Sequence, residues 1–237
     1  MSQVQLGEIV IDVILKDIKN VHLSVNPPHG HVRISAPMHM ELDMIRLYAI
    51  SRLAWIKKHQ KKFKAQKREA PREYVSRESH YYLGKRHLLK VIESNKPNKV
   101  VLKHSTIELH IRPETNREKR KEILNEWYRA QLKDLVANQI DKWEKTMELK
   151  VNEFGIKKMK TKWGTCNRDA KRIWINLELA KKPVQCIEYI VVHEMIHFLE
   201  RNHTDRFVSL MNNYLPNWRE LKEELNRLPV SHIEWEY

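Results

Sequence analysis

The chain has 237 residues, enough for one large domain or two small ones, and its hydrophobic content of 41% suffices for a buried core. Only 5 glycines, spread along the chain, argue against a linker-rich or disordered protein. A formal net charge of +14 and a pI of about 9.7 favour acidic partners, nucleic acid among them.

The cysteines and the N-terminus predict an intracellular setting. Cys166 and Cys186 are too few for a disulfide framework, so reduced thiols are expected and a single bridge is the alternative. Asp12 interrupts the only apolar run near the N-terminus, and no basic region precedes it, which predicts no signal peptide. No stretch approaches the roughly 18 apolar residues of a membrane span. We therefore expect a cytoplasmic protein without membrane contact.

The first third of the chain predicts strands followed by one helix. Short β-branched stretches at 9–15, 21–25 and 31–34 are separated by polar residues, prolines and Gly30, which indicates a meander or a hairpin pair. Apolar residues at helical spacing then predict a helix from residue 41 to about residue 67. Its far end is basic, either a solvated helix end or a surface for nucleic acid or another acidic partner. The residues of this basic run are Lys57, Lys58, Lys61, Lys62, Lys64, Lys67 and Arg68.

Strand patterns return over residues 80–112, with a hairpin at 81–92 and strands at 100–103 and 107–111. Thr115 and Glu118 then match a capping box, which predicts a long amphipathic helix to about residue 147. We therefore divide the chain into a β-rich region with one long helix, 1–112, and a second region, 113–237. One continuous domain is the alternative.

Two alternating stretches, 156–163 and 171–177, flank a predicted turn at 164–170. The resulting hairpin leads directly into the next predicted helix. Trp163, Gly164 and Thr165 then either shape the wall of a substrate cleft or form a turn anchored by the tryptophan. An edge strand beside a metal site could bind an extended peptide by strand addition.

The stretch 183–203 holds the best evidence for chemistry. Pro183 suits a helix start, and the helix that follows is apolar nearly all round, which is typical of a buried helix. Burying His193, Glu194 and His197 there costs free energy unless each finds a partner. His193 and His197 lie about 40° apart, one turn along the same face, so they can chelate one cation. Glu194 points to the side, where its carboxylate can reach a metal-bound water as a general base.

Zinc needs a third protein ligand, for which His203 is the candidate. Asn202 suits the required turn because asparagine tolerates the left-handed conformation, and Thr204 predicts the N-cap of a helix over 204–214. A last helix is predicted over 216–228. The spacing equals the metzincin pattern, except that Glu200 replaces its glycine. The histidines could instead be hydrogen-bonded core residues, and the other candidate ligands are Glu200, Asp205, Glu220 and Glu223.

Three motifs together resemble the YgjP-like metallopeptidase family, which is related to the SprT-like and WLM zinc proteases. They are the stretches 162–166 (KWGTC), 189–197 (YIVVHEMIH) and Asn202-His203. The resemblance is strongest over about 155–220, and Thr165 stands where the family usually has serine. It implies a zincin-type fold, zinc on His193, His197 and His203, and Glu194 as the catalytic acid/base.

The sequence thus predicts an α+β fold in which a β-rich N-terminal part precedes a zincin-like metallopeptidase domain. The predicted function is hydrolysis of peptide bonds in peptides or proteins by water that Zn²⁺ and a glutamate activate. One alternative is a basic protein associated with nucleic acid, whose zinc is only structural. Another is a protease that acts on proteins bound to nucleic acid.

Overall fold

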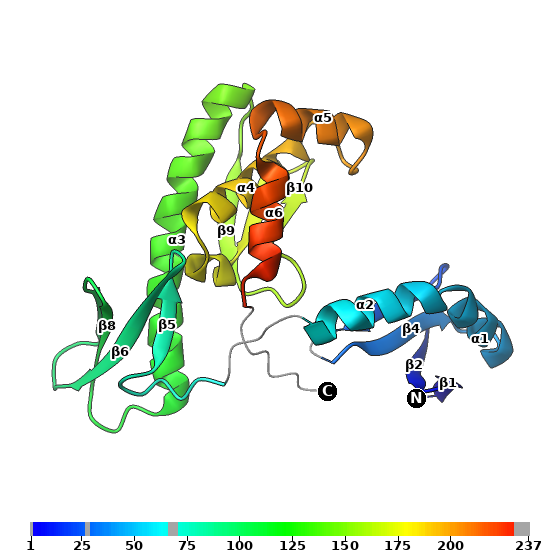
Figure 1. Ribbon diagram of the computed structural model, residues 1–237, viewed down its shortest axis with the longest axis horizontal. Coiled ribbons are helices and arrows are strands. Elements are labelled where there is room, and N and C mark those ends of the chain that lie inside the picture. The colour runs from blue at the N-terminus through cyan, green and yellow to red at the C-terminus, as the bar shows by residue number, and fades with distance from the viewer. Residues whose placement is uncertain (1, 27–28, 66–70, 230–237) are drawn as a thin grey trace. The chain divides into compact units, whose positions relative to one another are not determined.

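The computed structural model describes residues 2–26, 29–65 and 71–229 (Figure 1). The chain folds as two compact units that divide between residues 67 and 68. The division predicted at residues 112 and 113 therefore falls inside the second unit. The reason is a shared core, because Ile107, Leu109 and Ile111 belong to the same buried cluster as Leu124 and Tyr128. In the part of the chain that is described, no helix is long and apolar enough to cross a membrane.

The N-terminal unit is a four-stranded sheet with two helices. The strand order is β1-β2-β4-β3, in which β2 and β4 are parallel and the outer pairs are antiparallel. The three predicted strands are confirmed, but β1 was missed. The parallel pair β2–β4 excludes the predicted meander, whereas the antiparallel pairs β1–β2 and β3–β4 agree with the alternative, a pair of hairpins. The strands are β1 (Ser2–Leu6), β2 (Ile9–Lys16), β3 (His22–Asn26) and β4 (His31–Pro37).

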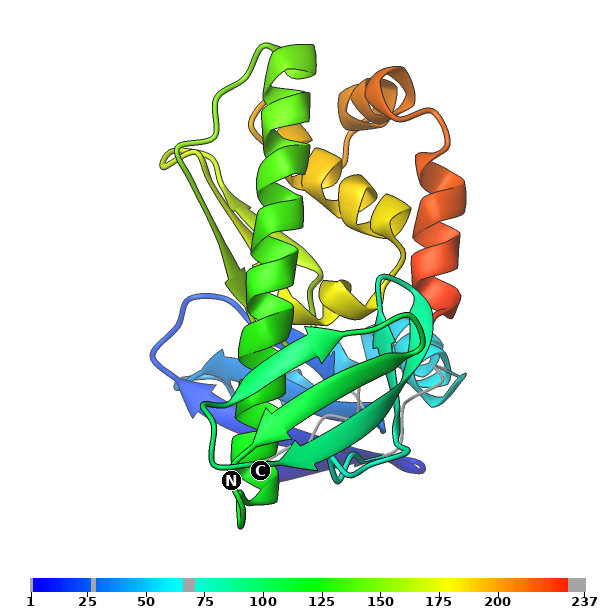
Figure 2. The same cartoon turned by 90° about the vertical axis from the view of Figure 1, so that its left-hand side faces the viewer.

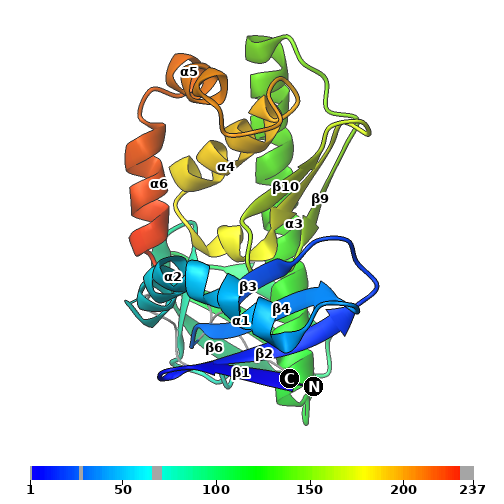
Figure 3. The same ribbon diagram turned by 90° about the vertical axis from the view of Figure 1, so that its right-hand side faces the viewer.

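Two helices stand where one was predicted over 41–67. They are α1 (Leu42–Ser51) and α2 (Leu53–Ala65), and the chain leaves helical geometry between them at Arg52, with φ −105° and ψ 8°. One straight helix of that length would extend about 40 Å, whereas four strands span about 20 Å. The break lets Ile45 and Ile56 enter the same buried cluster. Figure 3 shows both helices on one face of the sheet.

The second unit begins with a sheet of the same topology. Its order is β5-β6-β8-β7, with β6 and β8 parallel and the outer pairs antiparallel. The ββββα pattern of the first unit is therefore repeated, since a helix again follows the fourth strand. The strands, which confirm the prediction over 80–112, are β5 (Ser79–Tyr82), β6 (Lys85–Glu93), β7 (Lys99–Leu102) and β8 (Thr106–Ile111).

The long helix α3 (Arg117–Met147) connects this sheet to the rest of the unit (Figure 2). Its N-cap is Asn116, whose side chain accepts from the backbone N–H of Lys119 at 2.9 Å, so the predicted capping box at Thr115 is wrong. Its buried residues recur every three or four positions, which keeps one face in the core. At about 45 Å, α3 is long enough to pack against β8 at one end and β9 at the other.

A third, smaller sheet lies beside the histidine-bearing helix α4 (Val184–Ile196). Its order is β10-β11-β9, in which β10 is antiparallel and β9 parallel to the central strand β11. The predicted strand at 156–163 and turn at 164–170 are displaced, because β10 starts at Gly164 and residues 158–163 form a loop. The strands are β9 (Glu153–Lys157), β10 (Gly164–Asn167) and β11 (Arg172–Asn176). The remaining helices are η1 (Leu177–Lys181), α5 (Asp205–Tyr214) and α6 (Trp218–Arg227).

Candidate metal centre

Helix α4 is the buried helix that the sequence predicts. Pro183 occupies its N-cap position, and most of its side chains are buried, Glu194 included. It packs against α3, α5, α6, β10 and β11. An apolar helix surrounded on all sides in this way gives its few polar residues fixed positions.

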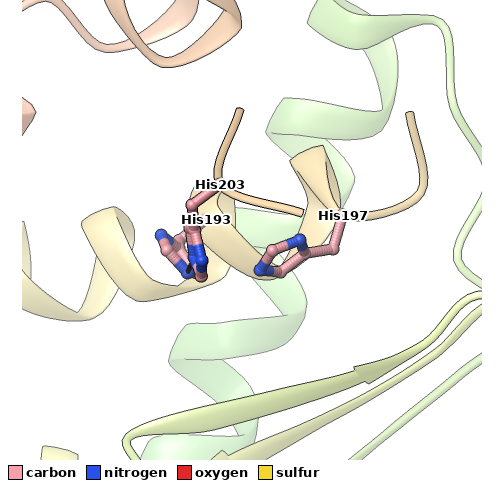
Figure 4. A group of neighbouring side chains, drawn as sticks. All are labelled: His193, His197 and His203. Atoms are coloured by element: carbon pink, nitrogen blue, oxygen red, sulfur yellow. Dashed lines mark hydrogen bonds between the residues drawn. The ribbon is translucent and has the colours of Figure 1, made fainter. Parts of the chain in front are cut away.

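Three imidazole rings converge at the end of this helix (Figure 4). One nitrogen from each of His193, His197 and His203 lies within 4.8 Å of the other two. Ring centroids are 4.9 Å apart for His193 and His197, 5.0 Å for His193 and His203, and 4.9 Å for His197 and His203. Among the described residues, these three histidines are the cluster of potential ligands that could hold a metal ion.

A compact turn brings His203 back to the helix. The helix ends at Ile196, earlier than predicted, and the N–H groups of Leu199 and Glu200 both donate to the Ile196 carbonyl at 2.9 Å. Glu200 Oε1 then accepts from the N–H of Asn202 at 3.2 Å. The left-handed conformation predicted for Asn202 is wrong, since no positive φ is found there. Hydrogen bonds to Glu200 shape this turn without the glycine of the metzincin pattern.

The hydrogen-bond contacts of the rings leave nitrogens placed to bind a cation. Nδ1 of His197 lies 3.0 Å from the carbonyl oxygen of Glu200, so Nδ1 carries the proton and Nε2 is left as the donor atom. Nε2 of His193 lies 3.0 Å from Nε2 of His203, a pair of nitrogens that a shared cation would bring into one coordination shell.

Two rings of the triad, those of His193 and His203, have lowered pKa values. Burial, together with the charges of the neighbouring histidines, lowers the pKa of His193 to about 3. Burial and His197 also lower the pKa of His203. Neutral imidazoles are the form that binds metal, so protons compete little for the nitrogens of His193 and His203 at neutral pH.

Phe207 forms a floor beneath the triad that the sequence did not reveal. Its ring centroid lies 5.0, 4.9 and 4.7 Å from those of His193, His197 and His203. The N-cap of α5 positions it, because Oγ1 of Thr204 accepts from the Phe207 N–H at 3.4 Å. Its position in the first turn after a predicted N-cap is the signal that could have found it.

Glu194 is almost fully buried, with 6% of its surface exposed, and lies against strand β10. Burial raises the pKa of its carboxyl group to about 8, and the positive charge of Lys162 opposes this rise. A divalent cation in the triad would lower the pKa further by attraction. A carboxyl group with a pKa near neutrality can both take up and release a proton.

The family of the chain follows from comparison with known proteins. A model of the YgjP-like metallopeptidase domain matches residues 19–228. The chain belongs to the YgjP-like family. The resemblance seen in the sequence motifs is thereby confirmed, and the domain is a metallopeptidase-family domain of α+β structure.

Solved structures and curated proteins add little to this assignment. The crystal structure of the metallopeptidase zymogen of Methanocaldococcus jannaschii jannalysin is similar at 24% identity, over 40% of this chain and 92% of that chain, with a TM-score of 0.33. No curated protein matches the chain.

The loop before β10 in this YgjP-like domain is held by the buried residue Asn176. Its amide nitrogen donates to the carbonyl oxygens of Met159 and Lys162 at 3.0 and 2.7 Å. Its backbone N–H donates to the Trp163 carbonyl at 2.9 Å. Trp163 packs partly buried against the core, and Nζ of Lys182 lies 5.8 Å from its ring centroid. These contacts explain why an alternating sequence forms a loop here, and they fix the start of β10.

Gly164 is the point at which β10 meets Glu194. A Cβ atom at residue 164 would lie 2.6 Å from Oε1 and 2.8 Å from Cγ of Glu194, closer than real contacts allow. Thr165, the next residue, pairs with Trp174 across β10 and β11. Trp163 therefore acts as an anchor on the core side, while Gly164 lies beside the carboxylate.

On the prediction that Glu194 is the general base, we expect Gly164→Ala to lower hydrolytic activity on the order of 10²-fold, because a displacement of about 1 Å at a reacting group has that effect. The added methyl group would push the Glu194 carboxylate out of place but would leave the histidines untouched. The measurement is peptidase rate and zinc content of the purified variant. Ser105→Ala is the control, because Ser105 is exposed in the turn between β7 and β8, in a different sheet. Full activity of Gly164→Ala would show that the close approach has no role.

The remaining candidate residues lie apart from the triad. Both cysteines are free, as predicted, and burial raises the pKa of each thiol to about 12. Cys186 contacts Glu224 of α6, a packing role. Glu223 pairs with Arg227 at 3.3 Å, away from the histidines. The alternative ligands Asp205, Glu220 and Glu223 do not belong to the potential metal-binding group formed by the three histidines.

Proposed function

We propose that this domain is a zinc-dependent metallopeptidase with a zincin-like catalytic arrangement. The observation that carries the proposal is the convergence of three histidine imidazoles beside one buried carboxyl group. Membership of a metallopeptidase family agrees with it. On this proposal the catalytic part lies within residues 113–237, as predicted from the sequence.

The donor set fits zinc. Three histidine nitrogens, with the His197 ring oriented by the Glu200 carbonyl, are a common ligand set of catalytic zinc sites, which keep a fourth position open. Closed structural sites usually have four protein ligands and are rich in cysteine, and neither cysteine belongs to the described group. The structural-zinc alternative is therefore disfavoured.

We assign the chemistry to the chain's own residues as follows. His193, His197 and His203 would hold the ion. When bound, zinc supplies Lewis acidity, which lowers the pKa of water towards about 7 and polarises a peptide carbonyl. Glu194 would take a proton from the attacking water and pass it to the nitrogen of the leaving amine.

Strand β10 is suited to hold the substrate. It is the edge strand of its sheet, and its first residue, Gly164, contacts Glu194. An extended peptide could add to this edge through backbone hydrogen bonds, which would bring its carbonyl groups past the triad. Gly164 and Thr165 would then contact the substrate, and Trp163 would anchor the strand.

Chelation tests the proposal as a whole. A chelator should abolish Glu194-dependent cleavage of an unfolded protein substrate, and stoichiometric Zn²⁺ should restore it. A magnesium salt is the control, because a three-histidine site does not suit that hard cation. Cleavage that persists in metal-free protein would refute a zinc mechanism.

Contact with nucleic acid and location in the cytoplasm stay predictions. In the basic run, the side chains of Lys57, Lys58, Lys61 and Lys64 are exposed on α2, which fits a solvated helix face equally well. Lys67 and Arg68 lie outside the described residues.

A further inference from the structure

Positive charges stand at both ends of the edge strand β10. Lys162 lies two residues before Gly164 and is exposed, and Arg168 directly follows Asn167, the last residue of the strand. The segment 157–172 carries seven cationic residues and a single acidic one, Asp169. No ion pair joins Lys162 or Arg168 to an acidic side chain within the described part of the chain. Their charges are thus available to a molecule that lies along β10.

These cations act on the candidate site itself. Lys162 lies two residues before Gly164, where an added Cβ atom would lie 2.6 Å from Oε1 of Glu194, and its charge lowers the pKa of that carboxyl group. Arg168 acts in the same way on Cys166 in the middle of β10. The loop hydrogen bond from Asn176 to the Lys162 carbonyl, 2.7 Å, fixes where the Lys162 side chain leaves the backbone.

A third cation approaches from the opposite element. Lys222 of α6 is exposed and acts through its charge on both His193 and His203. Its Nζ lies 5.6 Å from the ring centroid of Trp218, a cation–π contact. Positive charge therefore reaches the triad from the strand side and from the helix side.

We propose that this site selects peptide segments with acidic side chains on both sides of the bond to be cleaved. The proposal rests on the metallopeptidase function above and names its substrate class. An extended peptide on β10 would bring its flanking side chains close to Lys162 and Arg168, and a side chain near the triad would meet Lys222. Carboxylates are the peptide groups that complement these three charges.

The expected preference is moderate because the cations are exposed. A solvent-exposed ion pair changes affinity by about 2- to 5-fold, so two or three pairs together give roughly 10-fold. Salt should weaken the effect, since the Debye length falls from about 10 Å at 0.1 M to about 3 Å at 1 M.

The test uses the full chain carrying Glu194→Gln and loaded with zinc, so that peptides bind without being cut. Three labelled peptides, blocked at both ends, differ only at the positions on either side of a central dipeptide. These positions carry Glu in the first peptide, Gln in the second and Lys in the third. Fluorescence anisotropy should show about 10-fold tighter binding of the Glu peptide than of the Gln peptide at low salt. Blocked ends ensure that side-chain carboxylates, and not a terminal carboxylate, are measured.

Charge reversal supplies the matched comparison. Lys162→Glu should lower the preference for the Glu peptide several-fold, because one of the three cations is replaced by a group that repels it. A purely structural role would change the binding of all three peptides alike. Lys99→Glu is the control, because it makes the same charge change at an exposed position on β7, in a different sheet. An equal effect of both variants would mean that net charge alone acts, and would overturn the inference.

Other outcomes separate this inference from the proposed function. If the wild type cleaves all three peptides at equal rates, the metallopeptidase proposal stands and the inference is wrong. If none of the peptides binds, the inference is wrong as well. A single-stranded oligonucleotide could also bind, and lose affinity in Lys162→Glu, while the peptides show no preference. The cations would then bind nucleic acid, and the inference would be overturned.

Discussion

Glu194→Gln should retain zinc and lose hydrolysis by about 10²- to 10⁴-fold, the range that a general base contributes. Glutamine has nearly the same shape, so the contact with Gly164 and the packing of α4 should persist. It cannot take up the proton that the attacking water must lose. Peptidase rate and zinc content, measured on the same preparation, check this expectation.

Glu188→Gln is the matched control for that substitution. Glu188 lies on the same helix, but it accepts hydrogen bonds from Lys142 and Trp143 at 2.7 and 3.0 Å and does not face the triad. We expect this variant to keep its rate within a few-fold of the wild type. Undiminished turnover by Glu194→Gln would remove Glu194 from the role of base.

His203→Ala should release zinc and reduce hydrolysis to background. Removal of an outer-shell partner costs about 10- to 100-fold in metal affinity, and loss of a direct ligand should cost more. His203 is exposed, so its truncation should leave the fold intact. Zinc affinity by competition with a chromophoric chelator, together with circular dichroism, checks both statements.

The other acidic candidates near the turn provide the comparison. Asp205→Asn should keep zinc, because its carboxylate does not join the histidine group. Glu200→Gln should keep zinc as well, since it is the backbone carbonyl of Glu200 that orients His197. Zinc loss in Asp205→Asn with retention in His203→Ala would reassign the third ligand.

The buried helix and the approach of its histidines could be predicted because both follow from local periodicity. An apolar sequence with His193 and His197 one turn apart fixes which side chains share a face, whatever surrounds the helix. The return of His203 was predicted from spacing alone, although its mechanism was not. Asn202 was expected to turn the chain by its conformation, whereas Glu200 does so by hydrogen bonds.

Strand pairing could not be predicted in the same way. Hydrophobic alternation marks strands but does not say which strands pair, so the parallel pairs β2–β4 and β6–β8 gave no sequence signal. The loop at 158–163 shows the same difficulty. Its alternating pattern suggested a strand, but hydrogen bonds from Asn176, distant in sequence, hold it in another form. Contacts between distant residues decided both cases.

X-ray absorption at the zinc edge of the purified wild-type protein tests the central claim most directly. The account predicts one zinc per chain, with three imidazole nitrogens at about 2.0–2.1 Å and one further light-atom ligand that is not from the protein. The His203→Ala variant should carry no zinc as purified, and the zinc it binds when saturated with added Zn²⁺ should show a smaller imidazole contribution. A sulfur ligand, a fourth protein ligand, or a spectrum unchanged in His203→Ala would contradict an open zinc site on His193, His197 and His203.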